Sequence, residues 1–370
     1  MAKNYASFLG ANTPQGFVSF FDELYNPYEN CSAYIIKGGP GTGKSTLMKA
    51  ILYECEKRDF ATEKIYCSSD PDSLDGIIVP EIGVSVADGT SPHIIEPKFP
   101  GACENIINTG DFWDKNKLRT RADEIRSLSL ENSIHHRRSA KYLAAAGQIA
   151  EENIRLCAKY TDKDKADNFA FRFVQRELPK KKHCTPGRKS KRFISAITPK
   201  GKIFLDKNIS QNSYRVIGID DEYSDVSGTI LERIGETAIK NGYDVIFCHC
   251  PMKPKMQCEH IIIPEKNLAL MTIRSDHNIT IEFDRIIHTS RFFYEGINEH
   301  SAYLRFNRKL IRELTNEAIS ALKDAKSTHD KLEKIYIDAM DFSSLEKHCK
   351  DICDYIFSKE KIDIYNYKRT

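Results

Sequence analysis

Three observations predict an α/β protein built from two similar halves. Short apolar runs alternate with longer amphipathic stretches, the pattern of strands and helices in a parallel sheet. A glycine-rich turn at residues 38–43 joins one of these runs to the start of a helical pattern. The order of motifs in residues 1–178 returns in residues 193–370. We therefore expect two tandem parallel-sheet domains, each with an appended helical hairpin.

The composition is that of a globular protein with room for two cores. The chain has 370 residues, of which 41% are hydrophobic and 29% charged. No apolar run has the length of a membrane span, and the first residues lack the apolar core of a signal peptide. We therefore expect a cytoplasmic protein without membrane contact, whose 11 cysteines are reduced thiols.

The glycine-rich turn carries the clearest chemical signal. Apolar residues at 33–36 predict a buried strand, and a helical pattern opens at Lys44. Between them lies G-x-x-x-x-G-K-S, the phosphate-binding P-loop in its strand–loop–helix context. Glycines let backbone N–H groups converge on phosphate oxygens, and the helix N-terminus adds further donors and partial positive charge. The fold expected for both halves is therefore P-loop NTPase-like.

The motif assigns roles to its residues. Lys44 should reach the β- and γ-phosphates of a nucleotide, and the hydroxyl of Ser45 should bind Mg²⁺. The residues expected to hold the nucleotide are Gly38, Gly39, Pro40, Gly41, Thr42, Gly43, Lys44, Ser45 and Thr46.

A P-loop site also needs a carboxylate at the end of a neighbouring strand. Asp88 is the first choice, because it ends the apolar run VSVAD, and it is expected to bind Mg²⁺ and stabilise charge. Asp70 ends another strand and competes for the Mg²⁺-binding or water-positioning role. Asp72 and Asp75 lie in a turn-like segment, where a solvated turn is an equally good interpretation.

Cationic candidates are less specific. His93 could contact the γ-phosphate or a second substrate, or it could make a structural hydrogen bond in its loop. An arginine could neutralise transition-state charge. Arg119, Arg121, Arg137 and Arg138 lie on a helical stretch, but a solvated helix face is the better interpretation for each.

Two further patterns argue against other ligands. Cys248, Cys250, Cys258 and His260 have the spacing C-x-C-x7-C-x-H, which is not a common zinc pattern, so zinc is the less favoured interpretation there. No N-K-x-D motif follows the P-loop, so guanine specificity is not indicated and ATP is favoured by default.

The internal repeat aligns whole segments of the two halves. Tyr34–Gly38 corresponds to Tyr214–Gly218, and Ile77–Glu81 corresponds to Ile261–Glu265. His93 corresponds to His277. A period of this size is a duplication of a domain and not a solenoid repeat.

The second copy has lost the P-loop residues. Ser224 stands in the place of Lys44, Asp225 in the place of Ser45 and Thr272 in the place of Asp88. Acidic residues in the loop 218–226 would repel a triphosphate. We therefore predict a degenerate second domain that supports the first or completes the first site.

The expected domain organisation follows from these patterns. Residues 1–178 form a P-loop domain with a helical arm at about 111–177, and residues 193–370 form the degenerate domain with an arm at about 292–357. Residues 179–192, PKKKHCTPGRKSKR, are basic without any acid and read as a solvated linker. A less favoured alternative is contact with nucleic acid, because basic clusters release counterions from phosphates.

Several motifs together resemble an uncharacterised bacterial family of duplicated, tandem P-loop ATPases: NTPQGF, IIKGGPGTGKSTLMK, CSSDPDSLDG, VADGTSPH, SAITPKG and IIIPEKNLAL. The resemblance covers nearly the whole chain and implies ATP binding at residues 38–46. The chain departs from the family pattern at residues 220–226, where a second intact P-loop is expected.

The sequence therefore predicts a Mg²⁺-dependent ATP-binding protein with one competent site. The first hypothesis is an ATPase that couples hydrolysis to movement of its helical arms. The second is a small-molecule or nucleotide kinase with the arm as a lid. The third is a regulatory nucleotide-binding module with little turnover that presents its arms to an unidentified partner.

Overall fold

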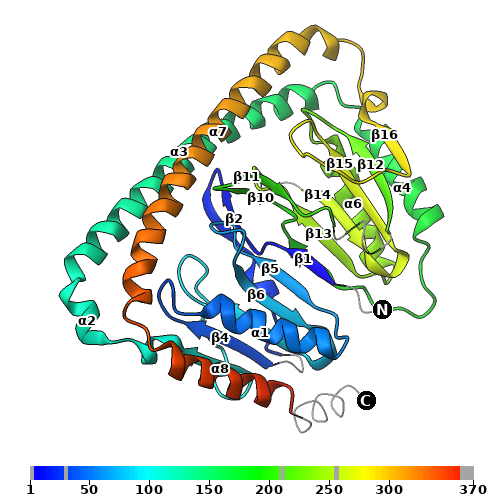
Figure 1. Ribbon diagram of the computed structural model, residues 1–370. Helices are drawn as coiled ribbons and strands as arrows, with labels where there is room; N and C mark the ends of the chain where they lie inside the picture. The colour runs from blue at the N-terminus through cyan, green and yellow to red at the C-terminus, as the bar shows by residue number, and fades with distance from the viewer. Residues whose placement is uncertain are drawn as a thin grey trace.

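The computed structural model contains two mixed six-stranded sheets joined by a pair of long helices (Figure 1). It describes residues 4–28, 32–207, 209, 212, 214–253 and 258–358. Residues 359–370 of the expected second domain lie outside the described residues.

The first sheet has the strand order β1-β5-β6-β7-β4-β8. All neighbouring strands are parallel except at β6, which is antiparallel to both β5 and β7. The strands are β1 (Tyr5–Ser7), β4 (Ser32–Lys37), β5 (Glu63–Tyr66), β6 (Leu74–Val79), β7 (Val84–Asp88) and β8 (Glu104–Asn108).

The second sheet repeats this order strand for strand, as β9-β13-β14-β15-β12-β16. Here β14 is the antiparallel strand. The strands are β9 (Lys189–Arg192), β12 (Arg215–Asp220), β13 (Val245–His249), β14 (Cys258–Ile263), β15 (Leu268–Ile273) and β16 (Arg285–His288). The repeat found in the sequence is thus visible in the topology.

The sheets are mixed, whereas the sequence analysis expected purely parallel ones. The cause is the length of two connections. Parallel neighbours need a crossover of a dozen or more residues, but β5, β6 and β7 follow one another through short turns and a 3-10 helix, η2 (Pro80–Ile82). A short connection can only return the chain antiparallel, and the second half uses the same solution.

Two hairpins lie where the halves meet. They are formed by β2 (Gly10–Thr13) with β3 (Gly16–Ser19), and by β10 (Ser195–Thr198) with β11 (Gly201–Phe204). The backbones of Phe8 and Phe193, at equivalent positions of the two halves, exchange two hydrogen bonds of 2.8 and 2.9 Å. Both rings are fully buried, so this contact fixes the halves against each other.

The helices divide into short ones beside the sheets and two long ones that span the molecule. In chain order the α-helices are α1 (Lys44–Lys57), α2 (Lys115–Thr120), α3 (Ala122–Ala158), α4 (Lys163–Glu177), α6 (Val226–Lys240), α7 (Ser301–Ile337) and α8 (Phe342–Ile356). The other short helices are η1 (Phe21–Glu23), η3 (Thr109–Phe112), η4 (Pro264–Lys266), η5 (Thr289–Phe292) and η6 (Ile297–His300).

The long helices do not form the hairpins expected for each half. Instead, α3 from the first half runs beside α7 from the second half along one edge of the molecule (Figure 1). A buried hydrogen bond of 2.7 Å from Asn307 to Asn153 joins them. The amphipathic pattern of each helix was visible in the sequence, but it fits any apolar partner and does not identify which one.

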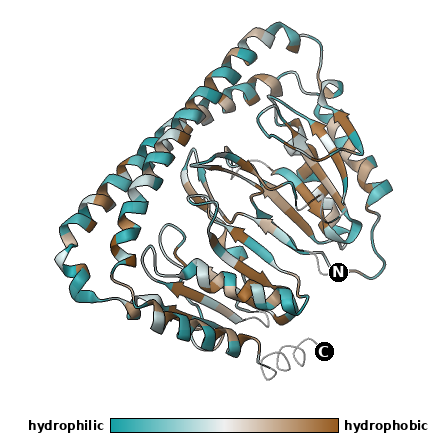
Figure 2. Ribbon diagram, viewed as in Figure 1, coloured by the Kyte–Doolittle hydropathy of each residue, from teal (hydrophilic) through white to brown (hydrophobic). Residues whose placement is uncertain are grey.

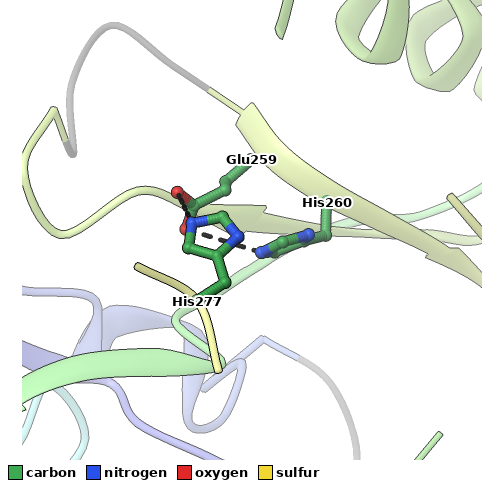
Figure 3. A group of neighbouring side chains, drawn as sticks. All are labelled: Glu259, His260 and His277. Carbon is green, nitrogen blue, oxygen red and sulfur yellow. Dashed lines mark hydrogen bonds and ion pairs between the residues drawn. The ribbon is translucent and has the colours of Figure 1, made fainter. Parts of the chain in front are cut away.

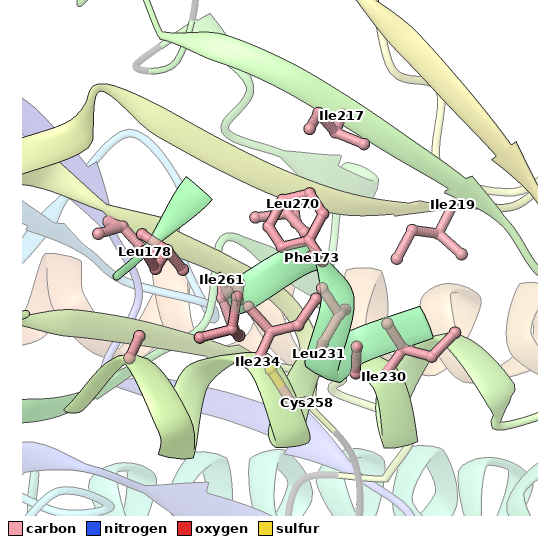
Figure 4. Close-up of a cluster of buried hydrophobic side chains, with 14 of the residues drawn as sticks. Phe173, Leu178, Ile217, Ile219, Ile230, Leu231, Ile234, Cys258, Ile261 and Leu270 are labelled. Carbon is pink, nitrogen blue, oxygen red and sulfur yellow. The ribbon is translucent and has the colours of Figure 1, made fainter. Parts of the chain in front are cut away.

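At their far ends the arms are exchanged between the halves. Helix α4 packs against α6 of the second half, where Phe173 and Leu178 join the core beneath β12 (Figure 4). Helix α8 packs against α1 of the first half, where Ile356 and Phe357 join the core. Burying one such large side chain contributes about 1.5–3 kcal/mol, so each half depends on a helix from the other.

The basic segment 179–192 is only partly a linker. Its last residues form β9, an edge strand paired with β13, which corrects the expectation of a solvated segment up to residue 192. Arg192 is buried and donates two hydrogen bonds of 2.6 and 3.0 Å to Glu63. Lys181, Lys189 and Lys191 also have acidic partners, which reduces the charge available for nucleic acid. Contact with nucleic acid stays a prediction.

Hydrophobic residues concentrate in the strands of both sheets, while long hydrophilic stretches line the paired helices (Figure 2). Among the described residues, no helix combines the length and apolar character needed to cross a bilayer. All the described cysteines are free thiols.

Candidate functional site

The glycine-rich loop at residues 38–43 opens onto a pocket of about 570 Å³ at the carboxyl edge of the first sheet. Strand β4 ends at Lys37 and α1 begins at Lys44, so the loop connects a central strand to a helix as the sequence predicted. All nine residues from Gly38 to Thr46 line the pocket. The carboxyl edge of parallel strands is where open α/β sheets bind ligands.

Glycines are required in this loop for two different reasons. Gly41 and Gly43 have φ angles of +67° and +74°, which favour glycine. Gly38 instead has no room, because a Cβ there would lie 2.0 Å from Oγ1 of Thr109. Gly43 is also the N-cap of α1, and it leaves the first turn of α1 without a side-chain cap or an acidic residue. The N–H groups of that turn therefore remain available to an anion.

Lys44 and Asp88, which the sequence analysis assigned to the same nucleotide site, lie next to each other in the structure. The Lys44 ammonium donates to the carbonyl oxygens of Gly38 at 3.0 Å and Gly39 at 2.7 Å. It lies 3.5 Å from Oδ2 of Asp88, and both side chains are largely buried. Asp88 ends β7 as predicted, and its Oδ1 accepts hydrogen bonds from the backbone and hydroxyl of Thr90. Ser45 also lines the pocket.

A third acid, Asp75, belongs to this group, although the sequence suggested a solvated turn. It lies in β6 and is 6% exposed. The pairing of β5 with β6 shifts register here, so Ile65 opposes Gly76 and Tyr66 opposes Leu74, leaving Asp75 without a cross-strand partner. Such a bulge changes the direction in which a side chain points. It depends on how the two strands pair, which the local sequence does not reveal.

Burial and charge set the protonation of this group. Burial raises the pKa of Asp75 to about 8, and the nearby carboxylate of Asp88 adds to the shift. Burial lowers the pKa of His93, although Asp88 acts in the opposite direction. Near neutral pH, the buried pair of Asp75 and His93 is therefore largely uncharged.

His93 faces the two acids rather than solvent. Its Nε2 lies 3.7 Å from Oδ1 of Asp75, its ring stacks on Phe21 at 4.6 Å, and its Nδ1 is buried without a hydrogen-bond partner. Ligand atoms of Asp75, Asp88 and His93 all lie within 4.8 Å of one another. This donor set could hold a metal ion beside the P-loop.

Asp70, the other predicted carboxylate, lines the pocket at some remove from this group. Its Oδ2 accepts a hydrogen bond of 3.1 Å from Ser73 and lies 3.5 Å from the ammonium of Lys326. Lys326 belongs to α7, so Asp70 contacts a cation contributed by the second half.

Helix α7 covers the glycine-rich loop. A Cβ at Gly41 would lie 2.7 Å from Cγ1 of Ile337. The pocket wall contributed by α7 consists of Leu322, Ala325, Lys326, His329, Glu333 and Ile337, and α3 adds His136. The prediction that the second half completes the first site thus matches the lining of the pocket.

None of the candidate arginines is among the described residues that line the pocket. Arg121 pairs with Glu124 at 2.8 Å, and Arg138 pairs with Asp324 of α7. The basic side chains that α3 and α7 do contribute are those of Lys326, His136 and His329. Sequence reasoning missed them, because the partner of α3 was unknown.

In the second half, the N–H groups of the equivalent loop donate hydrogen bonds to a side chain of the same loop, the carboxyl group of Asp221. Oδ1 of Asp221 accepts hydrogen bonds from the backbone N–H and hydroxyl of Ser224, and Oδ2 accepts one of 2.8 Å from the N–H of Ser227. Asp221 is 2% exposed. A pocket of about 750 Å³ lies next to this loop, but the N–H donors at the start of α6 already have an anionic partner.

No family model, no curated protein and no solved structure matches this chain. The interpretation of the pocket therefore rests on its own geometry.

Proposed function

We propose that the chain binds ATP with Mg²⁺ in the first-half pocket and hydrolyses it there, while the second half is a degenerate copy without a competent site. The observation that supports this most directly is the convergence of three features on one pocket. They are a glycine loop that a Cβ would obstruct, an uncapped helix N-terminus and a lysine beside a buried acid. Together they offer donors and positive charge to a polyphosphate.

The donor set fits Mg²⁺. Hydroxyl and carboxylate oxygens are the ligands that this ion prefers, and Ser45 and Asp88 supply them next to the loop, with Asp75 as a further ligand once the ion displaces its proton. When bound, Mg²⁺ would offset charge on the β- and γ-phosphate oxygens. The Nδ1 of His93 is buried without a hydrogen-bond partner, which leaves a polar atom of this group available to a ligand.

The protein's own residues account for the remaining requirements. Backbone N–H groups of the loop and the ammonium of Lys44 hold the phosphates. Asp88 or Asp70 would orient the attacking water and accept its proton. Lys326 would place a further positive charge opposite the P-loop, and α7 would exclude bulk water from the pocket.

ATP hydrolysis in this arrangement would act on α7. The helix contributes six residues between Leu322 and Ile337 to the first-half pocket, while Ser301, Leu304 and Arg305 near its start line the pocket of the second half. Contacts that change with the nucleotide therefore act on one rigid element shared by both halves. This favours coupling to a conformational change over a freely opening lid.

The test is to compare two substitutions at equivalent positions. Lys44→Ala should weaken ATP binding in calorimetry by about 100-fold or more, because it removes the principal charge from the cradle. Ser224→Ala changes the equivalent residue of the second half and should leave ATP affinity unchanged. An equal loss in both variants, or no MgATP binding by the wild-type protein, would contradict the proposal.

Turnover assays separate the three hypotheses. Phosphate release by the wild-type protein alone, lost in Lys44→Ala, supports an ATPase. Transfer of phosphate to a member of a metabolite pool would replace this interpretation with a kinase. Tight binding without either reaction would indicate a regulatory module.

A further inference from the structure

A second buried group of potential metal ligands lies in the other half of the molecule (Figure 3). Glu259 and His260 are neighbours on β14, and His277 follows β15. The side chains of all three are fully buried. Their ligand atoms lie within 4.8 Å of one another.

The group exists because the second half repeats the strand bulge of the first. Cys248 opposes His260 and His249 opposes Cys258, so Glu259 is left without a cross-strand partner, as Asp75 is in β6. Neighbouring residues on a regular strand point to opposite faces, whereas a bulge lets both face the same way. Glu259 and His260 can therefore converge on His277.

The internal repeat shows which ligands changed. Glu259 corresponds to Asp75 and His277 corresponds to His93, so the buried acid and histidine are present in both halves. The two remaining positions differ. Asp88 has become Thr272, and Gly76 has become His260. The second half has thus exchanged a carboxylate for an imidazole, which turns a set suited to Mg²⁺ into one suited to Zn²⁺.

The interatomic distances suit a small ion. Nε2 of His277 lies 2.9 Å from Oε1 of Glu259, and Nε2 of His260 lies 3.5 Å from Oε2. Ligands at about 2.0–2.1 Å from a tetrahedral zinc ion are about 3.4 Å apart. The separations therefore require only small adjustments.

The hydrogen bonds leave ligand positions open. Nδ1 of His277 lies 3.0 Å from the carbonyl oxygen of Thr272 and must donate to it, since a carbonyl only accepts. Its Nε2 then faces the acceptor oxygens of Glu259, so a positive species belongs between them. Neither ring nitrogen of His260 has a hydrogen-bond partner of adequate geometry, although the side chain is fully buried. A histidine oriented by a backbone carbonyl is the usual arrangement around a metal.

We propose that Glu259, His260 and His277 bind one divalent transition-metal ion of the Zn²⁺ class, which stabilises the second half. Ser195 donates to Oε2 of Glu259 at 3.3 Å, and Arg274 contacts Oε1 at 3.3 Å, so both orient the carboxylate from outside. Arg274 and Lys202 add positive charge that opposes a cation. Asp276, 2.7 Å from Lys202, offsets part of that charge.

This proposal does not depend on nucleotide binding by the first half. The ion would be enclosed by protein, so it would enter as the chain folds, and its binding energy would contribute to stability. The role expected of it is structural.

The experiment measures metal content of the full-length protein refolded with Zn²⁺ and then dialysed, using elemental analysis. One equivalent of zinc is expected in the wild type. His277→Ala and His260→Gln should each retain less than a tenth of it. His348→Gln, at an exposed histidine that belongs to neither donor set, is the control and should retain it in full, while His93→Ala reports any zinc held by the first half instead.

Two further readouts keep the result interpretable if a variant folds poorly. Co²⁺ in place of Zn²⁺ should give visible absorption bands of a tetrahedral site in the wild type. A strong chelator should lower the melting temperature of the wild type but not that of His260→Gln. Three outcomes would overturn the proposal: no stoichiometric zinc in the wild type, as much zinc in His277→Ala as in the wild type, or a loss of zinc confined to His93→Ala. The first outcome would mean that a proton alone bridges Glu259 and His277.

Discussion

The two halves share one architecture but treat the start of the first core helix in opposite ways. In the first half, α1 begins at Lys44, its N-cap Gly43 provides no side-chain cap, and its first residues line a pocket. In the second half, Asp221 bonds to the N–H groups of Ser224 and Ser227 at the start of α6. If the first half binds a nucleotide as proposed, a carboxylate of the chain itself occupies in the second half the place that a phosphate would take in the first. A duplicated domain would then have converted a binding site into a structural contact without changing its topology.

The largest effect should follow from removing the acid that distinguishes the two sites. Asp88→Ala should lower ATP turnover by about 100- to 1,000-fold, because it removes a proposed ligand of Mg²⁺ and the acidic partner of Lys44. Thr272→Ala alters the equivalent residue of the second half and should leave turnover within about twofold of the wild type in steady-state assays. Similar losses in both variants would show that the halves share the chemistry.

The second prediction concerns the internal carboxylate. Asp221→Ala removes three buried hydrogen bonds at the start of α6 and should destabilise the fold by about 1–3 kcal/mol in denaturant titrations. Glu232→Ala, at an exposed position on the same helix, should have little effect. If Asp221→Ala is as stable as the wild type, the carboxylate does not replace a ligand in this half.

A smaller effect is expected from the cation that crosses between the halves. Lys326→Ala should lower kcat/KM for ATP by about tenfold, equivalent to about 1.4 kcal/mol, because it removes positive charge from the pocket wall. Lys323→Ala on the same helix is the control, since that residue is exposed and does not line the pocket. Equal activity of Lys326→Ala and the wild type would mean that α7 only covers the site.

The smallest effect should be a dependence on pH. Burial lowers the pKa of both His136 and His329, which line the same pocket. A bound phosphate would raise these pKa values, so binding takes up protons and affinity should increase a few-fold as the pH falls from about 8 to 6. The charged neighbours that also act on them are His135, Lys326, Asp330, Glu333 and Asp70.

Calorimetry without added Mg²⁺ measures this dependence. The double variant His136→Gln with His329→Gln should bind with a flatter pH profile. An unchanged profile in the double variant would assign the protons to other groups.

Local features of the fold could be predicted from the sequence, because short-range patterns determine them. The strand expected at 33–36 is β4, the helix opens at Lys44, and VSVAD is a strand that ends in Asp88. Glycines and a lysine at fixed spacing identify the loop before any packing is known. The equivalent segments of the second half followed from the repeat.

Features that depend on distant partners could not be predicted in this way. The position of Asp75 depends on a bulge between β5 and β6, and the wall formed by Lys326 depends on which helix pairs with α3. The final residues of the basic segment look solvated by composition, yet Arg192 is buried against Glu63. In each case the deciding contact joins residues that the local pattern does not relate.

The exchange of α4 and α8 has a practical consequence for dissecting the molecule. Cleavage or expression of the chain in two pieces at residues 179–188 would separate each sheet from a helix that completes its core. Phe173 would remain on the first fragment, without its core neighbours in the second half. Ile356 would remain on the second fragment, without its core neighbours in the first half. The two pieces should regain a folded form only when mixed, as a complemented pair.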